Sequence, residues 1–311
     1  MVPILAHLSE SKRKMTSKCF FLLVAFLFFT GISPAQENHA EYTVLFYNVE
    51  NLFDLKDNPE TLDYDFTPVG NRYWTYERFQ RKILRLSKVI MSAGGWNPPG
   101  MVALCEIENQ YVLHRLIRDT PLKSYPLKII HKESPDDRGI DVAFLYNEEV
   151  FYPLKYQYFP LKKGDGSVVE TREILSLSGI VGGKDTMHFF VNHWPSRYDG
   201  LLETQDLRNQ AAETLRSLVE AKQAKNPASK VIILGDFNDQ PRDESVSNIL
   251  GAVGISEGTK PGHIVNLSLQ WLDDETGTLK FRSQWSVFDQ IMVTRSLLMA
   301  QDRKSTRLNS S

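Results

Sequence analysis

Five apolar segments of the chain end in, or enclose, side chains that could bind a metal ion or a phosphate group. A Gly or an Asn after a strand is ordinary turn chemistry, so the unusual feature is the repeated presence of carboxylates. If the segments are strands whose ends converge, their polar residues would form one rim. The candidates are Asn48 and Glu50, Glu106, Asn192 and His193 with the nearby Arg197, Asp236 and Asn238, and Asp289.

Asp289 is the hardest of these residues to explain as a surface group. It is flanked by Val287, Phe288, Ile291 and Met292. A carboxylate in such a segment must be solvated, paired or bound to a metal, because burying it alone costs several kcal/mol. Single carboxylates at strand ends are more often turn residues or helix caps.

The residue types favour phosphoester hydrolysis. Asp and Glu oxygens suit hard cations, so we expect Mg²⁺ as the cofactor, with Mn²⁺ or Ca²⁺ as alternatives. An Asp beside an Asn could orient an attacking water, and a His could act on the phosphate or the leaving group. The chain has no G-x-S-x-G motif for acyl transfer, no phosphate-binding Walker loop and no Cys/His cluster with zinc spacing.

Short apolar runs alternate with helical patterns in the part of the chain that must position these groups. This mixture predicts an α/β or α+β fold with covered sheets. We expect strands at 42–49, 100–108, 139–147, 187–195, 230–238 and 281–294. We expect helices at 76–95, 109–119, 203–224 and 243–251, the first with Phe79, Ile83, Leu86 and Ile90 on its inner face.

The N-terminal region is typical of a secretory signal. A basic stretch precedes an apolar run from Cys19 to about Ile32, and Ser33-Pro34-Ala35 offers small residues at a cleavage site. We therefore expect a signal peptide at 1–35 and export to the periplasm or the cell exterior. The alternative is an uncleaved membrane anchor, although the run is short for a transmembrane helix.

Removal of residues 1–35 would take away four cations and one Glu, which changes the net charge from −2 to −5. Such a chain is not a strongly basic nucleic-acid binder. Cys105 would then have no cysteine partner, so we expect no disulfide and a fold that depends on its apolar core.

Six short motifs, taken in order, resemble the endonuclease/exonuclease/phosphatase superfamily. They are "NVEN", "ALCEIEN", "RGIDVAFLY", "NHWPSR", "GDFND" and "WSVFDQI", and they lie between Tyr42 and Thr294. The sequences of these motifs are most similar to those of secreted family members from Bacteroides-type bacteria. The resemblance implies an α/β four-layer sandwich, in which two mixed sheets pack face to face under outer helices and the site lies where strand ends meet.

The resemblance also implies a role for each candidate residue. The implied metal ligands are Glu106, Glu50 and Asp289. The implied catalytic residues are Asn48, His193, Asp236 and Asn238, with Asp236 orienting water and Asn238 binding phosphate. We assign Arg197 and Asn192 to substrate binding, although Arg197 could equally be a solvated loop residue.

The chain departs from the family pattern after Asp289. Family members continue into a last strand that carries Ser-Asp-His, and no such motif follows here. We expect a domain at 36–300 that lacks this strand and an unstructured tail at 301–311, which resembles foreign sequence.

The function expected from the sequence is therefore an exported, metal-dependent phosphoester hydrolase. Its expected partner is a nucleic acid or a small phosphodiester, and it is expected to be a monomer without a stable protein partner. The alternative is a catalytically impaired or non-catalytic phosphate- or nucleic-acid-binding protein. A third hypothesis is a surface adhesin or structural protein, whose stability would not depend on Mg²⁺.

Overall fold

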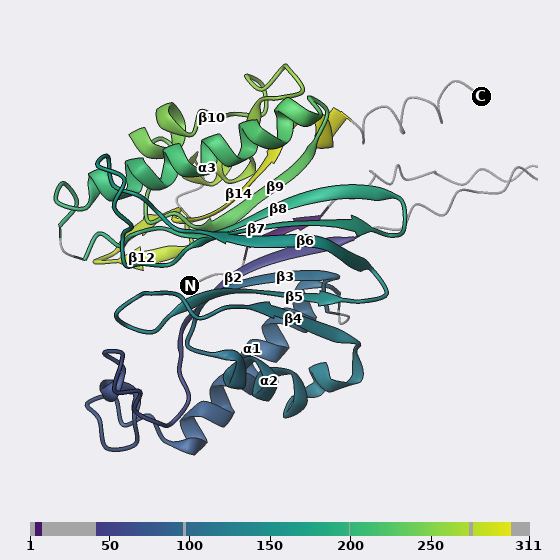
Figure 1. Ribbon diagram of the computed structural model, residues 1–311. Helices are drawn as coiled ribbons and strands as arrows, with labels where there is room; N and C mark the ends of the chain where they lie inside the picture. Colours follow the sequence, from purple (N-terminus) through teal and green to yellow (C-terminus); the bar gives the residue numbers. More distant parts are fainter. Residues whose placement is uncertain (1–3, 8–41, 96–97, 199, 274–275, 300–311) are drawn as a thin grey trace, which may run out of the picture.

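The computed structural model describes residues 4–7, 42–95, 98–198, 200–273 and 276–299 (Figure 1). The predicted tail at 301–311 lies outside the described residues, and so does the predicted signal peptide apart from Ile4–His7. Among the helices that the structure describes, none has the length and apolar character needed to cross a bilayer.

The first sheet has five strands in the order β1-β2-β3-β5-β4. Strands β2 and β3 are parallel and the other pairs are antiparallel, so the sheet is mixed. The strands are β1 (Ile4–His7), β2 (Thr43–Leu52), β3 (Met101–Ile107), β4 (Leu127–His131) and β5 (Asp141–Asn147).

The second sheet has seven strands in the order β10-β11-β14-β9-β8-β7-β6 and is also mixed. Its strands are β6 (Phe151–Phe159), β7 (Ile174–Val181), β8 (Asp185–His193), β9 (Lys230–Asp236), β10 (Ala252–Val253), β11 (Ile264–Asn266) and β14 (Asp289–Thr294). A separate hairpin joins β12 (Leu279–Phe281) and β13 (Gln284–Ser286).

Four layers result, as predicted. Helices α1 (Tyr76–Ala93) and α2 (Gln110–Arg118) cover the outer face of the first sheet, and α3 (Gln205–Lys225) covers the second (Figure 1). The inner faces of the two sheets bury a common apolar core, and separate cores lie under the helices. Short helical turns are η1 (Tyr64–Phe66), η2 (Pro121–Ser124), η3 (Ser245–Ile249) and η4 (Leu267–Asp273).

The helical patterns place α1 correctly and α3 only in part. The predicted inner face of α1, from Phe79 to Ile90, is buried, and Gly94 ends the helix. The sequence pattern puts Leu207, Ala211, Leu215 and Leu218 on one face of α3; Ala211 and Leu215 are buried, but Leu207 and Leu218 are only half-buried. The buried face instead includes Arg208, which the apolar pattern could not indicate.

Two predicted elements are wrong in extent. The strand expected at 281–294 is broken twice. Phe281 ends β12 and the left-handed Arg282 and Ser283 precede β13; Val287 and Phe288 then separate β13 from β14. The helix expected at 243–251 is a single π-helical turn. The "KKGDGS" stretch at 162–167, whose composition predicts a hairpin, lies between β6 and β7, which complete the inner face of the second sheet. Strands β4, β10 and β11 were not predicted.

A hydrogen-bonded chain on the second sheet joins Lys222 to His188 through Ser178. Lys222 donates to the Ser178 hydroxyl (3.1 Å), and that hydroxyl lies 2.7 Å from His188 Nδ1. Burial, and then the Lys222 charge, lower the pKa of His188 to about 4. In the unfolded chain, His188 has its ordinary pKa of about 6.5. The contribution of His188 to the free energy of unfolding is therefore fully present above about pH 6.5 and is lost as the pH falls towards 4.

We expect His188→Gln to flatten the pH dependence of stability between about pH 6.5 and 4. Urea unfolding at both ends of this range measures the free energy of unfolding. The wild type should lose more stability on acidification than the variant. His114→Gln, on helix α2, is the matched control and should keep the wild-type slope; an unchanged slope in His188→Gln would contradict this account.

Candidate active site

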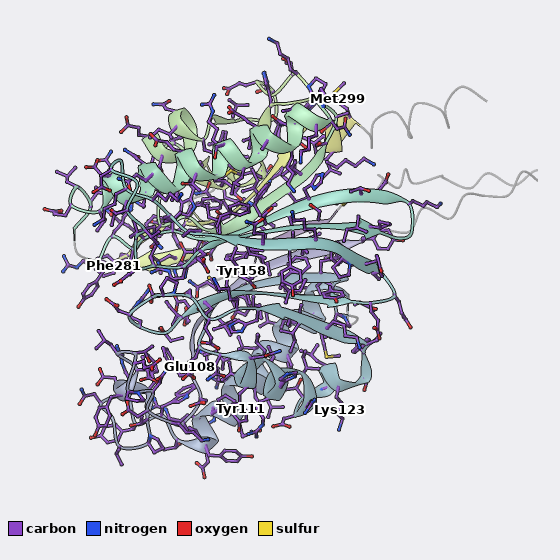
Figure 2. All side chains as sticks on the ribbon, viewed as in Figure 1. Glu108, Tyr111, Lys123, Tyr158, Phe281 and Met299 are labelled. Atoms are coloured by element: carbon purple, nitrogen blue, oxygen red, sulfur yellow. The ribbon has the colours of Figure 1, made fainter. Side chains whose placement is uncertain are left out.

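The strand ends converge at one end of the sandwich. His193 at the end of β8 pairs in register with Asp236 at the end of β9, and Asp236 pairs with Asp289 at the start of β14. Strands β2 and β3 end at the same place in the first sheet. Glu108 and Phe281 lie at this end of the molecule, whereas Lys123 and Met299 lie at the other (Figure 2).

Asn48 joins the two sheets at this point. Its fully buried Nδ2 donates to Glu106 Oε1 (2.9 Å) and to Asp236 Oδ2 (3.0 Å). Its Oδ1 accepts from the amide of Glu50 (2.9 Å). One amide side chain therefore holds a carboxylate from each sheet and also fixes the backbone of the residue two positions on.

Left-handed backbone places three of the site residues. Glu50, Glu106 and Asn238 have φ values of 56°, 61° and 49°. Such values are uncommon outside Gly, and residues held there cluster at functional sites. The register of β2 and β3 shifts beside Glu50 and Glu106, so each strand bulges and its acidic side chain is redirected.

Gly235 lets β9 lie close to β8. A Cβ there would stand 2.3 Å from the carbonyl oxygen of Asn192, which leaves no room for any other residue type. Close packing of β9 against β8 therefore explains why the "GDFND" motif begins with Gly. The same packing places Asp236 beside His193.

Asp236 is buried and held at both oxygens. Oδ1 accepts from the amide of Asn238 (2.9 Å) and Oδ2 accepts from Asn48. Burial raises the pKa of Asp236 to about 6, against the lowering effect of the Asn238 amide, and the Glu106 charge adds to the rise. A carboxylate with this pKa can accept a proton near neutral pH.

Asp289 is 1% exposed, and neither of its carboxylate oxygens has a hydrogen-bond partner among the described residues. Burial raises its pKa well above the usual range, and repulsion by Asp236 and Glu106 adds to the rise. Three acidic groups therefore meet in a buried space without enough donors. An orphaned buried carboxylate of this kind is what a bound cation would satisfy.

His193 is neutral in this environment. Burial holds its pKa well below the usual value, and the charges of Arg172 and Arg138 lower it further. Its Nε2 lies 4.0 Å from Glu106 Oε1, and its buried Nδ1 has no partner in the described part of the chain. The ring can therefore offer a donor or an acceptor to a ligand at the site.

One group of the site residues could hold a metal ion. Glu106, His193 and Asp236 each bring one ligand atom into a group whose members lie within 4.8 Å of one another. Of the predicted ligands, Glu106 belongs to this group; Glu50 and Asp289 lie outside it, although their charges act on the site. His193 and Asp236, predicted as catalytic residues, lie in the same group.

The sequence did not indicate Arg172, a buried cation whose charge acts on two residues of the site. It donates to Asp136 (2.6 Å) and to the carbonyl of Trp194 (2.8 Å), and its charge acts on His193 and Asp236. Arg172 precedes β7 in an unremarkable "TREIL" stretch. Only its burial marks it, and no motif signals that burial.

Arg197 braces the loop behind the site. Its Nε donates to the carbonyl of Asn238 (2.5 Å), and its Nη2 pairs with Asp239 (2.5 Å) and Asp243. With these partners it positions Asn238, whose side chain donates to the Trp194 carbonyl (2.9 Å). This placement does not support the direct substrate binding that we predicted for Arg197.

Asn192 also lies apart from its predicted role. It is fully buried, and its amide donates to the carbonyls of Phe190 (3.1 Å) and Leu234 (3.4 Å). Its oxygen accepts from the Trp194 indole (3.2 Å). The bond to Leu234 joins β8 to β9, so Asn192 supports the sheet at this point.

The fold is therefore an α/β four-layer sandwich with a buried acidic site, containing one imidazole, at the ends of its strands. A family model described as the Endonuclease/Exonuclease/phosphatase family matches residues 43–310, and the chain belongs to this family. No curated protein sequence matches the chain.

Solved structures with the same fold are distant in sequence. The human Nocturnin catalytic domain, with a bound sulfate anion, is 14% identical with a TM-score of 0.54; the alignment covers 81% of this chain and 82% of that one. A mannosyl-6-phosphatase from Bacteroides thetaiotaomicron is 14% identical with a TM-score of 0.51, covering 81% and 84%. D. rerio TDP2, complexed with a single-strand DNA product, is 16% identical with a TM-score of 0.50, covering 81% and 82%.

We expect Asp289→Asn to raise the melting temperature of the metal-free protein, because the change removes a buried acid without partners. Each kcal/mol gained corresponds to roughly 2–4 °C. Added Mg²⁺ should stabilise the wild type more than the variant, since a cation offsets the clustered carboxylates. Thermal melts in EDTA and in Mg²⁺ measure both effects.

The control for this experiment is Asp185→Asn, on the same sheet at the other end of β8. It should leave the Mg²⁺-dependent shift unchanged. Equal Mg²⁺ shifts in Asp289→Asn and the wild type would show that Asp289 does not act on cation binding.

Proposed function

We propose that this protein is an exported phosphoester hydrolase that depends on a divalent cation. The observation that carries the proposal is the Asn48 bridge, which sets the Glu106 and Asp236 carboxylates beside a neutral His193 and the partnerless Asp289. Membership in the endonuclease/exonuclease/phosphatase family supports phosphoester hydrolysis as the reaction class.

The donor set fits a hard divalent cation. Glu106 and Asp236 supply oxygens, and the surplus of buried carboxylate favours positive charge. These two carboxylates would hold the ion, with Mg²⁺ preferred and Mn²⁺ or Ca²⁺ as alternatives, and His193 beside them would contact the phosphate. Such an ion polarises a phosphoryl group and stabilises the negative charge of the leaving oxygen.

The protein's own residues would orient the water and the phosphate. Asp236 is fixed by Asn48 and Asn238, and each of its oxygens retains a free acceptor site, so it can align a water and take its proton. Asn238 uses one amide hydrogen on Trp194 and has a second for a phosphate oxygen. Neutral His193 can hydrogen-bond the phosphate without repelling the neighbouring acids.

The substrate proposed is a nucleic acid or a small phosphoester. The similar structures named above include a protein with a single-strand DNA product and a sugar phosphatase, so the fold accommodates both kinds.

We expect Glu106→Gln and Asp236→Asn each to lower kcat on bis(p-nitrophenyl) phosphate by about 10²–10⁴-fold in the presence of Mg²⁺. Release of p-nitrophenol measures the rate, and EDTA should abolish it. Glu149→Gln, an exposed acid between β5 and β6, is the control and should keep wild-type activity.

Turnover by the two site variants at the wild-type rate would refute the assigned roles. Cation-dependent phosphate binding without any turnover by the wild type would favour the non-catalytic alternative. Stability and phosphate binding that do not depend on Mg²⁺ would favour a structural surface protein.

Export and a monomeric state are part of the proposal. The support is the basic and apolar pattern of residues 12–35, which is typical of a secretory signal. Fractionation of expressing bacteria should recover a shortened chain outside the cytoplasm, and light scattering should give the mass of one chain. A full-length product in the cytoplasm would contradict the export proposal.

A further inference from the structure

A groove of about 430 Å³ lies between the end of β2 and helix α1, on the outer face of the first sheet. Its walls include two aromatic side chains and four basic ones. They are Tyr47, Trp74, Arg78, Arg81, Lys82 and Arg85. The groove is not part of the cation group described above, and the proposed reaction does not use it.

The charge of this groove is opposite to that of the chain. Helix α1 carries five basic residues and one Glu, whereas the whole chain has a net charge of −2. The four groove residues are spaced i, i+3, i+4 and i+7, so they form one stripe along the helix. At 1.5 Å per residue the stripe is about 10 Å long.

Two of these basic groups are fixed by protein and two are available. Arg78 donates to the carbonyls of Arg72 and Tyr73 (3.0 Å for the latter), and Lys82 donates to the Glu50 carbonyl (2.7 Å) beneath the Trp74 ring. Arg81 and Arg85 are exposed and have no hydrogen bond or ion pair with any described residue. Their guanidinium groups are free to bind an anion in a concave, aromatic-lined space.

The groove adjoins the candidate active site through β2. Glu50, two residues after Asn48, lines the groove, and its carbonyl holds Lys82. The Glu50 and Glu106 charges both act on Lys82, which shows how near the two regions lie. A chain of phosphodiesters with one phosphate at Asn238 could therefore continue past Glu50 onto α1.

We propose that this groove binds a strand of single-stranded nucleic acid that runs on from the scissile phosphate. The proposal rests on the proposed hydrolase function for the identity of that phosphate. A stripe of about 10 Å can contact two successive phosphates, which matches the two available guanidinium groups. Guanidinium groups bind phosphate in a bidentate manner, and the half-buried Tyr47 gives a base an aromatic surface beside them.

The test compares Arg81→Gln/Arg85→Gln with Lys88→Gln, which removes a charge from the same helix outside the groove. Fluorescence anisotropy measures binding of a labelled oligothymidylate of about twelve nucleotides to the full chain, in EDTA and at salt concentrations from about 50 to 200 mM. We expect the double variant to bind about tenfold more weakly or worse. Its slope of log K against log salt should fall by about 1.4, or about 0.7 for each lost phosphate contact.

Several outcomes decide the proposal. Lys88→Gln should bind as the wild type does, and Arg81→Lys/Arg85→Lys should recover the salt slope because it keeps both charges. Equal affinities for the double Gln variant and the wild type would overturn the proposal, and so would an equal loss in Lys88→Gln. Competition by pyrophosphate at concentrations similar to the oligonucleotide, with the same dependence on both arginines, would overturn the assignment to a strand.

Hydrolysis of bis(p-nitrophenyl) phosphate separates this inference from the proposed function. This small diester does not reach the groove, so the double variant should hydrolyse it at the wild-type rate. Arginine-dependent binding in a protein that hydrolyses no diester would support the groove and overturn a hydrolase that acts on phosphodiesters. If the protein hydrolyses the diester but binds the oligonucleotide equally well without both arginines, the hydrolase proposal is supported and the groove proposal is overturned.

Discussion

The structure of the site depends on one buried amide. Asn48 donates to a carboxylate from each sheet, so it holds together two groups that would otherwise repel each other. Carboxylates in a buried space are costly unless hydrogen-bonded or paired with positive charge. The raised pKa values of Asp236 and Asp289 show that protein donors satisfy this requirement only in part. The remaining demand for positive charge makes the site suited to a cation.

The backbone is shaped around the same point. The bulges in β2 and β3 and the left-handed conformations of Glu50, Glu106 and Asn238 turn side chains out of the regular alternation of a strand. Each such residue costs of the order of 1–3 kcal/mol. The cost is borne at the strand ends, while the apolar interior of the sandwich holds the two sheets in register.

Buried arginines stabilise the outer parts of the site without neutralising its centre. Arg208, fully buried in α3, pairs with Asp239 Oδ1 (2.8 Å), and the half-buried Arg197 pairs with the same oxygen (2.5 Å). Arg172 is held by Asp136 and the Trp194 carbonyl. Arg197 and Arg208 fix the loop that carries Asn238, and the charge of Arg172 adds to burial in lowering the pKa of His193, yet the acidic centre keeps its negative character.

The sequence by itself determined the fold class, the strands β2, β3, β5, β8 and β9, the helices α1 to α3, and the placement of Asn48, Glu106, His193, Asp236 and Asn238 at strand ends. Local periodicity and short motifs encode these features, because a strand pattern and the polar residue that ends it lie within about ten positions. Tertiary structure alone decided which acids lie together, the hydrogen-bond partners of Arg197 and Asn192, and the burial of Arg172. These depend on contacts such as Asn48 with Asp236, which are 188 residues apart, and no local pattern reports the burial or the partner of a residue at that separation.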